Sequence, residues 1–259
     1  MLTDAELDAC AELVDELCAF AVERIVADRP RAEQISTKTS DADWVTETDL
    51  AVERHVREAI AERFPEHRIV GEEFGASGDD GAAASWYVDP VDGTTNFVHG
   101  LPVSSFSIAV VDAEGPAVGA VADPYRREVL SAVRGRGALL DGAPTRCADA
   151  TSVMGGIFLT ELTMQSLWPG QTLLMSSLAQ AGCVTRILGS NALSLASVGA
   201  GRAVATLIGR FSLVDCQAGS LIAREAGAEV RFERGGVLCA APGVVDEVLA
   251  LWAAAENGR

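Results

Sequence analysis

Two stretches near the start of the chain repeat apolar residues at every third or fourth position, which predicts helices with one buried face. In the first stretch the apolar positions run over residues 7–25, Thr3 and Glu6 form a capping box in front of them, and Pro30 follows. The second stretch predicts another helix, which is capped by Thr46 or Thr48 and stopped by Pro65. Its buried positions are Val52, Val56 and Ile60.

The middle of the chain has shorter apolar runs separated by turn residues, which is the pattern of β-strands. Turn pairs such as Glu114-Gly115 and Asp141-Gly142 favour neighbouring antiparallel strands, whereas the small and polar residues 76–85 predict a loop. Antiparallel strands combined with helices indicate an α+β lobe. The predicted strands are Arg68–Val70, Trp86–Val88, Ser105–Val111, Ala117–Asp123 and Glu128–Val133.

The C-terminal part alternates helical and strand patterns more evenly, which suggests βα units. A lobe boundary near residues 148–152 divides the chain into an α+β lobe, residues 1–150, and an α/β lobe, residues 151–259. The elements expected after the boundary are the strands Gly156–Thr160, Val204–Ile208, Val230–Phe232 and Val237–Ala240, and the helices Leu173–Ala181, Asn191–Ala200 with Ser190 as its cap, Asp215–Ala226 and Val244–Ala255.

The composition is typical of a globular protein with a substantial core, since 49% of the 259 residues are hydrophobic and 22% are charged. The six cysteines show no CxxC spacing, so neither a zinc site nor a disulfide framework is indicated. No apolar run reaches membrane-spanning length, and the acidic, helical N-terminal stretch does not resemble a signal peptide. We therefore expect a cytoplasmic protein without a membrane partner.

The charge balance narrows the range of expected partners. The 37 acidic residues against 20 basic ones give a formal net charge of −17, which disfavours nucleic acid and favours cations or a metal-bridged anion. All basic residues except Lys38 are arginines. Because a compact ammonium and a planar guanidinium are not interchangeable, a single lysine suggests a chemical role. The alternative is a solvated linker, since residues 31–43 are polar and predict a loop.

The stretch that carries most chemical information is Trp86–Gly100, with the sequence WYVDPVDGTTNFVHG. Asp89 and Asp92 follow a predicted strand and are separated by a proline and a valine. Two carboxylates on a rigid turn can share hard cations, which prefer oxygen ligands. The backbone N–H groups of Gly93 and Thr94 could hold a phosphate beside those cations. The alternative is a simple Asp-Gly turn capped by polar side chains.

DPVDGTTNFVHG closely resembles the central motif of the inositol monophosphatase-like phosphatases, which depend on Mg2+ and are often inhibited by Li+. The resemblance covers most of the chain and implies a layered αβαβα fold with two lobes, and a homodimer. It extends from about Lys38 to Gly227, and its other motifs, in the family's order, are DWVTETD at Asp43–Asp49, GEE at Gly71–Glu73, and Asp215 followed by AGSLIAREAG at Ala218–Gly227.

The resemblance also implies the roles of particular residues. Carboxylates hold two or three Mg2+ ions, a threonine held by an aspartate orients the attacking water, and the lysine-bearing loop closes over the site. The helix dipole alone would also explain an acid at the start of a helix, as at Asp49 and Asp215. Carried over one by one, the metal ligands are Glu72, Asp89, the backbone carbonyl of Val91, Asp92 and Asp215; the catalytic residues are Asp49, Thr94, Glu73 and Lys38; and the phosphate-binding residues are Gly93 and Thr94.

The residues expected to contact the alcohol depart from the family pattern. Family members that act on inositol phosphate carry a glutamate seven residues before the last metal-binding aspartate and commonly a tryptophan directly before it, where this chain has Ile208 and Val214. Because isoleucine has no hydrogen-bond acceptor, inositol 1-phosphate is expected to be a poor substrate. The predicted substrate contacts are Ser190, Asn191 and Ile208, and a local shift of the alignment would offer Asn191, Arg210 or Ser212 in place of the missing acid.

The sequence therefore predicts a Mg2+-dependent phosphomonoesterase that hydrolyses a small alcohol or sugar phosphate. One alternative is a nucleotide 3′-phosphatase or sugar bisphosphatase of the same superfamily. Another is a regulatory homologue that has kept the fold and lost turnover. Metal-dependent release of phosphate from a generic aryl phosphate would separate the two kinds of enzyme from the regulatory protein.

Overall fold

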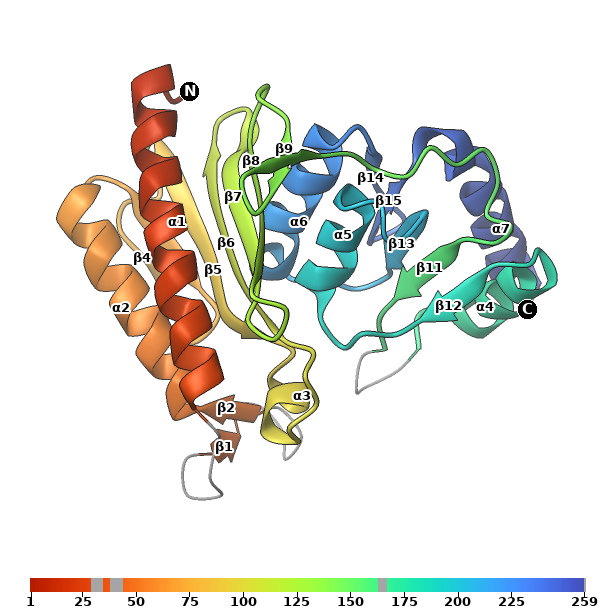
Figure 1. The fold of residues 1–259 in the computed structure, drawn as a ribbon, viewed down its shortest axis with the longest axis horizontal. Coiled ribbons are helices and arrows are strands. Elements are labelled where there is room, and N and C mark those ends of the chain that lie inside the picture. Colours follow the sequence, from red (N-terminus) through yellow and green to blue (C-terminus); the bar gives the residue numbers. More distant parts are fainter. Residues whose placement is uncertain (29–34, 38–43, 163–166, 259) are drawn as a thin grey trace.

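The structure is a computed structural model that describes residues 1–28, 35–37, 44–162 and 167–258. Helices and two large sheets stack in the order helix, sheet, helix, sheet, helix (Figure 1). This order confirms the predicted layered αβαβα fold. From one side to the other, the helical layers are α1 (Asp4–Ala27) with α2 (Glu47–Arg63), α5 (Asn191–Gly199) with α6 (Leu213–Glu225), and α4 (Gln171–Gln180) with α7 (Val245–Asn257).

The larger sheet has eight strands in the order β10-β9-β8-β7-β6-β5-β3-β4, and every neighbouring pair is antiparallel except β3 and β5. The predicted antiparallel strands are thereby confirmed. Because β3 and β5 are parallel, the residues that follow them meet at the same edge of the sheet. The strands are β3 (Arg68–Gly71), β4 (Gly75–Ser77), β5 (Ala84–Asp92), β6 (Ser105–Asp112), β7 (Gly115–Asp123), β8 (Glu128–Val133), β9 (Ala138–Leu140) and β10 (Ala143–Thr145).

The smaller sheet has five strands in the order β12-β11-β13-β15-β14 and is mixed. Strand β11 is parallel to both of its neighbours, whereas β15 is antiparallel to β13 and β14. Only the first part of this sheet therefore follows the predicted βα pattern. Its strands are β11 (Ile157–Thr160), β12 (Val184–Arg186), β13 (Ala205–Ile208), β14 (Glu229–Glu233) and β15 (Gly236–Ala240); the other elements are the paired β1 (Ile35–Thr37) and β2 (Trp44–Thr46), helix α3 (Thr94–Val98) and the short 3-10 helix η2 (Pro242–Val244).

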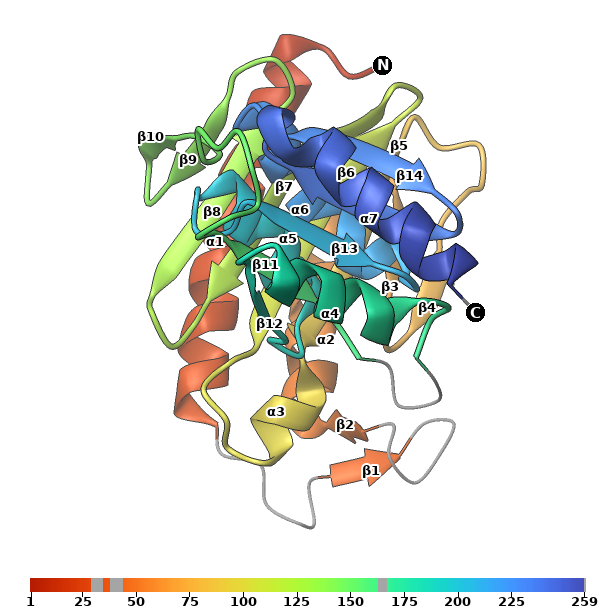
Figure 2. The ribbon, with the colours of Figure 1, turned by 90° about the vertical axis from the view of Figure 1, so that its right-hand side faces the viewer.

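Four clusters of buried apolar side chains fill the spaces between the layers. Trp86 lies in the cluster under α1 and α2, and Trp252 lies in the cluster under α4 and α7, which cover the outer face of the smaller sheet (Figure 2). Both faces of each sheet are consequently covered. A central strand such as β6 is buried along most of its length, which explains its continuous apolar run.

Strand β5 is longer than the sequence predicted, and the added part contains two candidate ligands. The apolar run Trp86–Val88 continues to Asp92, although Pro90 has no N–H to donate. The pairing with β6 shifts register between Asp89 and Asp92, so the proline lies in a bulge where the regular ladder is interrupted. The bulge lets the strand carry its acids to the edge of the sheet.

The predicted loop over residues 76–85 is wrong at both ends. Strand β4 includes residues 76 and 77, and β5 begins at Ala84. Strand β4 is a short, exposed edge strand of small residues that exists because it pairs with β3. Strand β12 was also not predicted, and it too is a short edge strand. Neither strand has an apolar pattern that marks it in the sequence.

Side-chain caps decide where two helices begin. Thr46, and not Thr48, caps α2: its hydroxyl accepts the N–H groups of Thr48 at 3.2 Å and Asp49 at 3.4 Å, and the Asp49 carboxylate completes a capping box. Helix α6 begins earlier than expected because the Ser212 hydroxyl caps it. Asp215 therefore lies within the first turn of α6 and not at its first residue.

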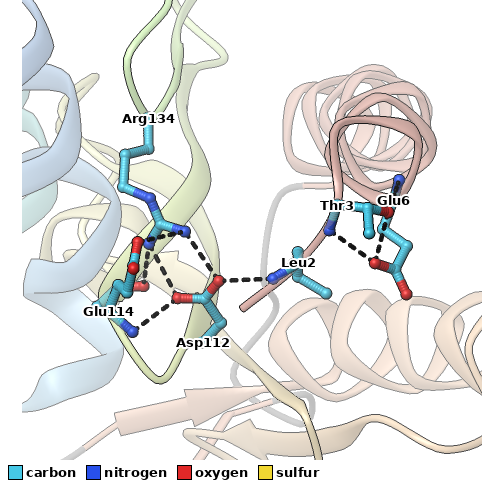
Figure 3. Close-up of polar contacts among 7 residues, drawn as sticks. Leu2, Thr3, Glu6, Asp112, Glu114 and Arg134 are labelled. Carbon is cyan, nitrogen blue, oxygen red and sulfur yellow. Dashed lines mark hydrogen bonds and ion pairs between the residues drawn. The ribbon is translucent and has the colours of Figure 1, made fainter.

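A network around Asp112 ties the start of the chain to the larger sheet (Figure 3). The Leu2 N–H donates to Asp112 Oδ2 at 2.9 Å, and the Arg134 guanidinium donates to both carboxylate oxygens at 2.9 and 2.8 Å. These hydrogen bonds, those from Arg134 foremost, hold the pKa of Asp112 well below its usual range.

The predicted capping box of α1, which lies beside this network, is confirmed: Thr3 N–H donates to Glu6 at 2.7 Å, and Glu6 N–H donates to Thr3 at 3.3 Å.

The remaining expectations concern thiols, membranes and lobes. All six cysteines lie in the described part and are free, as their spacing predicted. Within the described residues, no helix is long and apolar enough to span a membrane.

The lobe boundary at residue 150 stays a prediction. The larger sheet uses residues 68–145 and the smaller sheet residues 157–240, yet α5 and α6 pack against both.

Candidate active site

A cavity of about 190 Å3 lies at the edge of the larger sheet, beside the first turns of α5 and α6. Four acidic residues line it together: Glu72 after β3, Asp89 and Asp92 on β5, and Asp215 on α6. These carboxylates come from three places that are far apart in the sequence. The other residues that line the cavity are Trp44, Val91, Gly93, Thr94, Thr95 and Gly189.

The end of β5 turns sharply so that both of its acids face the cavity. Asp89 Oδ1 accepts the N–H of Val91 at 3.0 Å, which closes a local turn around the proline. Gly93 follows with a φ of 92°, a left-handed conformation that glycine adopts without strain. A Cβ at Gly93 would also lie only 2.8 Å from the carbonyl oxygen of Gly189. This turn therefore requires glycine at position 93, and α3 starts directly after it.

Asp92 lies against the start of α5, which donates most of its hydrogen bonds. Its carboxylate accepts from the Ser190 hydroxyl, from the Ala192 N–H at 2.7 Å and from the Asn191 N–H at 3.3 Å. Burial nevertheless raises the pKa of Asp92 to about 7. The Asn191 side chain also donates to Asp215 at 3.1 Å, so the first residues of α5 hold two of the four carboxylates.

The Thr94 hydroxyl lies between two acceptors, the Val91 carbonyl oxygen at 2.9 Å and Asp49 Oδ1 at 3.3 Å. A hydroxyl carries one proton, so it donates to one of them at a time. The other Asp49 oxygen accepts the Thr46 N–H at 2.9 Å and the Thr46 hydroxyl. Burial is the main cause that raises the pKa of Asp49 to about 6. Asp49 thus caps α2 and contacts Thr94, while its part in orienting water stays a prediction.

The four carboxylates together fit a hard cation by charge and donor type. Burial, followed by repulsion from Glu72, Asp92 and Asp215, raises the pKa of Asp89 well above its usual range. Burial, followed by repulsion from Asp92 and Glu72, raises the pKa of Asp215 to about 7. A cation such as Mg2+ prefers oxygen ligands and would remove this repulsion. Among the described residues, no three His, Cys, Asp or Glu side chains are arranged so that they could hold a metal ion as they stand, so the fit rests on charge and donor type alone.

The sequence model of the inositol monophosphatase family matches residues 6–255. The chain belongs to the inositol monophosphatase family. Membership makes the chain a phosphatase, in agreement with the motifs in its sequence, and the family is generally metal-dependent.

Individual members of the inositol monophosphatase family resemble the chain over most of its length. Nus factor SuhB of Pasteurella multocida is 38% identical over 224 residues, which cover 83% of this chain and 84% of that protein. Inositol-1-monophosphatase SuhB of Mycobacterium tuberculosis is 37% identical over 237 residues, which cover 83% and 80%. The solved structure of the IMPase of Thermotoga maritima matches with a TM-score of 0.85 and 29% identity, and covers 98% of this chain and 99% of that one.

Most residues assigned by the inositol monophosphatase motifs meet at the cavity. The predicted ligands Glu72, Asp89, Val91, Asp92 and Asp215, and the predicted phosphate-binding residues Gly93 and Thr94, all line it. The roles of these residues stay predictions, since the structure shows only that they lie together. Glu73 directly follows Glu72, and the role that the resemblance implies for it, orienting a water molecule near the metal, is likewise a prediction. Lys38 lies outside the described residues.

None of the predicted substrate contacts belongs to the lining of the cavity, although Ser190 and Asn191 contact acids that do. The buried Ser190 donates to Asp92 and caps α5, and Ile208 is 1% exposed within the apolar cluster between α6 and the smaller sheet. The buried Asn191 Oδ1 lies beside the cavity without a hydrogen-bond partner among the described residues. Substrate roles for these three residues stay predictions, and Ile208 contributes no polar group.

Two further residues at the site were not singled out by the sequence motifs. Glu161, which follows β11, is buried and accepts the N–H groups of Gly189 at 2.6 Å and Leu188 at 3.4 Å. Burial raises the pKa of Glu161 to about 7. Trp44 is the one aromatic side chain among the described residues that line the cavity. A single acid after an apolar strand was the only available signal for Glu161, and its partners are about thirty residues away in the sequence.

The raised pKa values predict that the metal-free protein loses thermal stability as the pH rises. A carboxyl whose pKa is about 6 or 7 when folded, as for Asp49, Asp92 and Asp215, contributes stability that is complete below its unfolded pKa. That contribution is lost as the pH rises through the folded value. In EDTA, we expect Tm to fall between about pH 4 and pH 7, and saturating Mg2+ to remove most of the fall. Differential scanning calorimetry measures both curves.

The control for this titration is NaCl at the ionic strength of the Mg2+ sample, because salt screens the general repulsion of an acidic protein without filling the site. A Tm that stays level with pH in EDTA, or a fall that NaCl removes as well as Mg2+, would contradict the expected repulsion within the cavity.

Proposed function

We propose that the chain is a Mg2+-dependent phosphomonoesterase that hydrolyses a small alcohol or sugar phosphate. The observation that carries the proposal is one small cavity lined by Glu72, Asp89, Asp92 and Asp215 and by the Thr94 hydroxyl. A phosphate ester repels an incoming nucleophile through its own negative charge. Acids that hold cations beside the ester would allow its negative charge to be neutralised, and a neighbouring hydroxyl could position the attacking water.

Bound Mg2+ would neutralise the phosphate and lower the pKa of a water molecule. The chain's own residues would hold and orient the reactants. When Thr94 donates to Asp49, its oxygen can accept a hydrogen bond from the attacking water and so set the direction of attack. The N–H groups of Gly93 and Thr94 would bind phosphoryl oxygens. Two or three ions would be held by Glu72, Asp89, the Val91 carbonyl, Asp92 and Asp215.

The position at which inositol phosphatases are expected to carry an acidic acceptor for a polyol holds Ile208 in this chain. Ile208 is buried in an apolar cluster, so no carboxylate at that position reaches the substrate. Trp44 adds an aromatic surface to the cavity lining. A hydroxyl that is desolvated without a partner costs about 1–3 kcal/mol. These features support a substrate with fewer hydroxyls than inositol phosphate, or with a different shape.

A substrate panel tests both the reaction and its selectivity. We expect Mg2+-dependent phosphate release, with kcat/KM for myo-inositol 1-phosphate roughly ten- to a hundredfold below that of the best monophosphate among sugar, histidinol and nucleotide phosphates. A clear lead for inositol 1-phosphate would refute the interpretation of Ile208. The panel on the unmodified protein is decisive here. Ile208→Glu would bury a carboxylate among apolar side chains and is expected to lower stability.

The same panel addresses the alternatives. Highest activity on a 3′-phosphonucleotide or a sugar bisphosphate would assign the chain to another branch of the superfamily. The other alternative is a regulatory protein without turnover. We retain it because one relative is named Nus factor SuhB. Absence of metal-dependent phosphate release from p-nitrophenyl phosphate, in a protein that still binds Mg2+, would favour this regulatory role.

The assembly and location of the chain are also proposals. A homodimer is expected from the resemblance, and an apolar groove of about 540 Å3 beside α3 supports it by offering a face to cover. Leu101, close to this groove in the sequence, is 54% exposed. A cytoplasmic location, and the absence of nucleic-acid and membrane partners, rest on the charge and composition of the sequence.

A further inference from the structure

Glu53 on α2 is a carboxylate that belongs to no predicted site. Its residue is 0% exposed, although ionised carboxylates are rarely buried without compensation. A buried charge is tolerated when its oxygen atoms accept well-placed hydrogen bonds. The donors that surround a buried charge therefore indicate what it holds in place.

The donors to Glu53 come mainly from the backbone of one turn. Glu53 Oε2 accepts the N–H of Glu73 at 2.7 Å, and Oε1 accepts the N–H of Phe74 at 3.2 Å. The third donor is Arg57 Nε at 2.8 Å, one turn further along α2. Both backbone donors belong to the turn between β3 and β4, which also carries Glu72. The carboxylate thus binds the backbone immediately after a predicted metal ligand.

Gly71 makes this close approach possible. A Cβ at Gly71 would lie 1.9 Å from Glu53 Oε1 and 2.3 Å from its Cδ, so any larger residue would displace the carboxylate. On the other side of the turn, the N–H of Glu72 donates to the Val88 carbonyl oxygen at 3.1 Å. The backbone of Glu72 is therefore held between strand β5 and the side chain of Glu53.

Arg57 extends the same contact to the far end of the hairpin. Its Nη1 donates to the Ser77 hydroxyl at 2.8 Å, and its Nη2 donates to the Gly75 carbonyl oxygen. The guanidinium also lies 5.8 Å from the centre of the Phe74 ring. Helix α2 thereby holds the whole β3–β4 hairpin, first through Glu53 and then through Arg57.

We infer that Glu53 is a positioning residue that sets the geometry of the Glu72–Glu73 turn and hence the affinity of the cavity for its metal. This inference rests on the proposed function, in which Glu72 is a metal ligand. A group that orients a ligand from behind typically changes metal affinity by about ten- to a hundredfold when it is replaced. A carboxylate that only stabilised the fold would change Tm and leave metal affinity unaltered.

The first experiment compares Glu53→Gln with Glu58→Gln, a matched change at an exposed position of the same helix. Mg2+ is titrated calorimetrically into each folded protein well below its Tm, without substrate. We expect Glu53→Gln to bind Mg2+ about tenfold or more weakly, because an amide has one acceptor atom for two backbone donors, and Glu58→Gln to match the wild type. Unchanged Mg2+ affinity in Glu53→Gln overturns the inference. A wild-type protein that binds no Mg2+ removes the proposed function, and the inference with it.

The second experiment keeps the carboxylate and removes its space. Gly71→Ala is expected to weaken Mg2+ binding about as much as Glu53→Gln, since the new methyl group displaces Glu53. In the double variant Glu53→Ala with Gly71→Ala, the methyl group has room. Its loss of Mg2+ affinity is therefore expected to be smaller than the sum of the losses in Glu53→Ala and Gly71→Ala measured separately. Wild-type affinity in Gly71→Ala, or strictly additive losses in the double variant, would overturn the inference even where Glu53→Gln does not fold.

Discussion

Asp89→Asn is expected to abolish phosphate release while the protein remains folded. Asp89 is buried in the cavity and is surrounded by Glu72, Asp92 and Asp215, which raise its pKa together with burial. In the proposed site it would be one of the carboxylates that hold Mg2+ and supply charge stabilisation. Loss of several kcal/mol of charge stabilisation lowers the rate by roughly a thousandfold or more. The measurement is Mg2+-dependent release of phosphate from the best substrate of the panel.

The melting temperature distinguishes this result from unfolding. Asparagine removes a charge that is repelled by its neighbours, so the metal-free Asp89→Asn protein should melt at or above the wild-type Tm at about pH 8. The stabilisation by Mg2+ should be largely lost. Asp112→Asn is the matched control, since Asp112 is a buried aspartate of the same sheet outside the cavity. It should lower Tm and keep kcat. Near wild-type turnover by Asp89→Asn would refute the metal assignment.

Replacement of the Thr94 hydroxyl is expected to give the second large effect. Thr94→Val keeps the shape of the side chain and removes the group that contacts Asp49 and the Val91 carbonyl oxygen. If the hydroxyl orients the attacking water, kcat falls by roughly a hundredfold or more. Gly93 and not Thr94 occupies the cap position of α3, so the stability cost is that of one local hydrogen bond, about 1 kcal/mol. Steady-state kinetics and thermal melting separate the two effects.

Two variants complete this test. Thr94→Ser keeps a hydroxyl and should recover most of the lost kcat. Thr48→Val removes a buried threonine hydroxyl that donates to Asp28 at 2.9 Å, outside the cavity, and should lower Tm without changing kcat. A Thr94→Val protein that melts earlier but retains its kcat would reduce Thr94 to a turn-stabilising residue.

The sequence by itself determined the helices and most of the longer strands, whereas the layered fold and the candidate metal ligands were implied by its resemblance to the inositol monophosphatases. Periodic apolar positions and capping residues act over a few neighbouring residues, which is why α1, with Thr3 and Glu6 at its start, was predicted closely. The acids of the site stand inside motifs whose order can be read along the chain. That they line one cavity follows from the parallel pairing of β3 with β5 and from the place of α6, which only the tertiary structure supplies.

Only the tertiary structure decided what holds those acids and what lies behind them. Ser190 read as a helix cap in the sequence, and the fold adds its hydrogen bond to Asp92, 98 residues away. Nothing in the sequence distinguishes Glu53 from the other acids of its helix, and only the fold places its carboxylate against the turn after Glu72. Ile208 read as a missing acceptor, and the fold buries it between two layers. Contacts of this kind depend on how separate elements pack, and no local preference for helix, strand or turn encodes them.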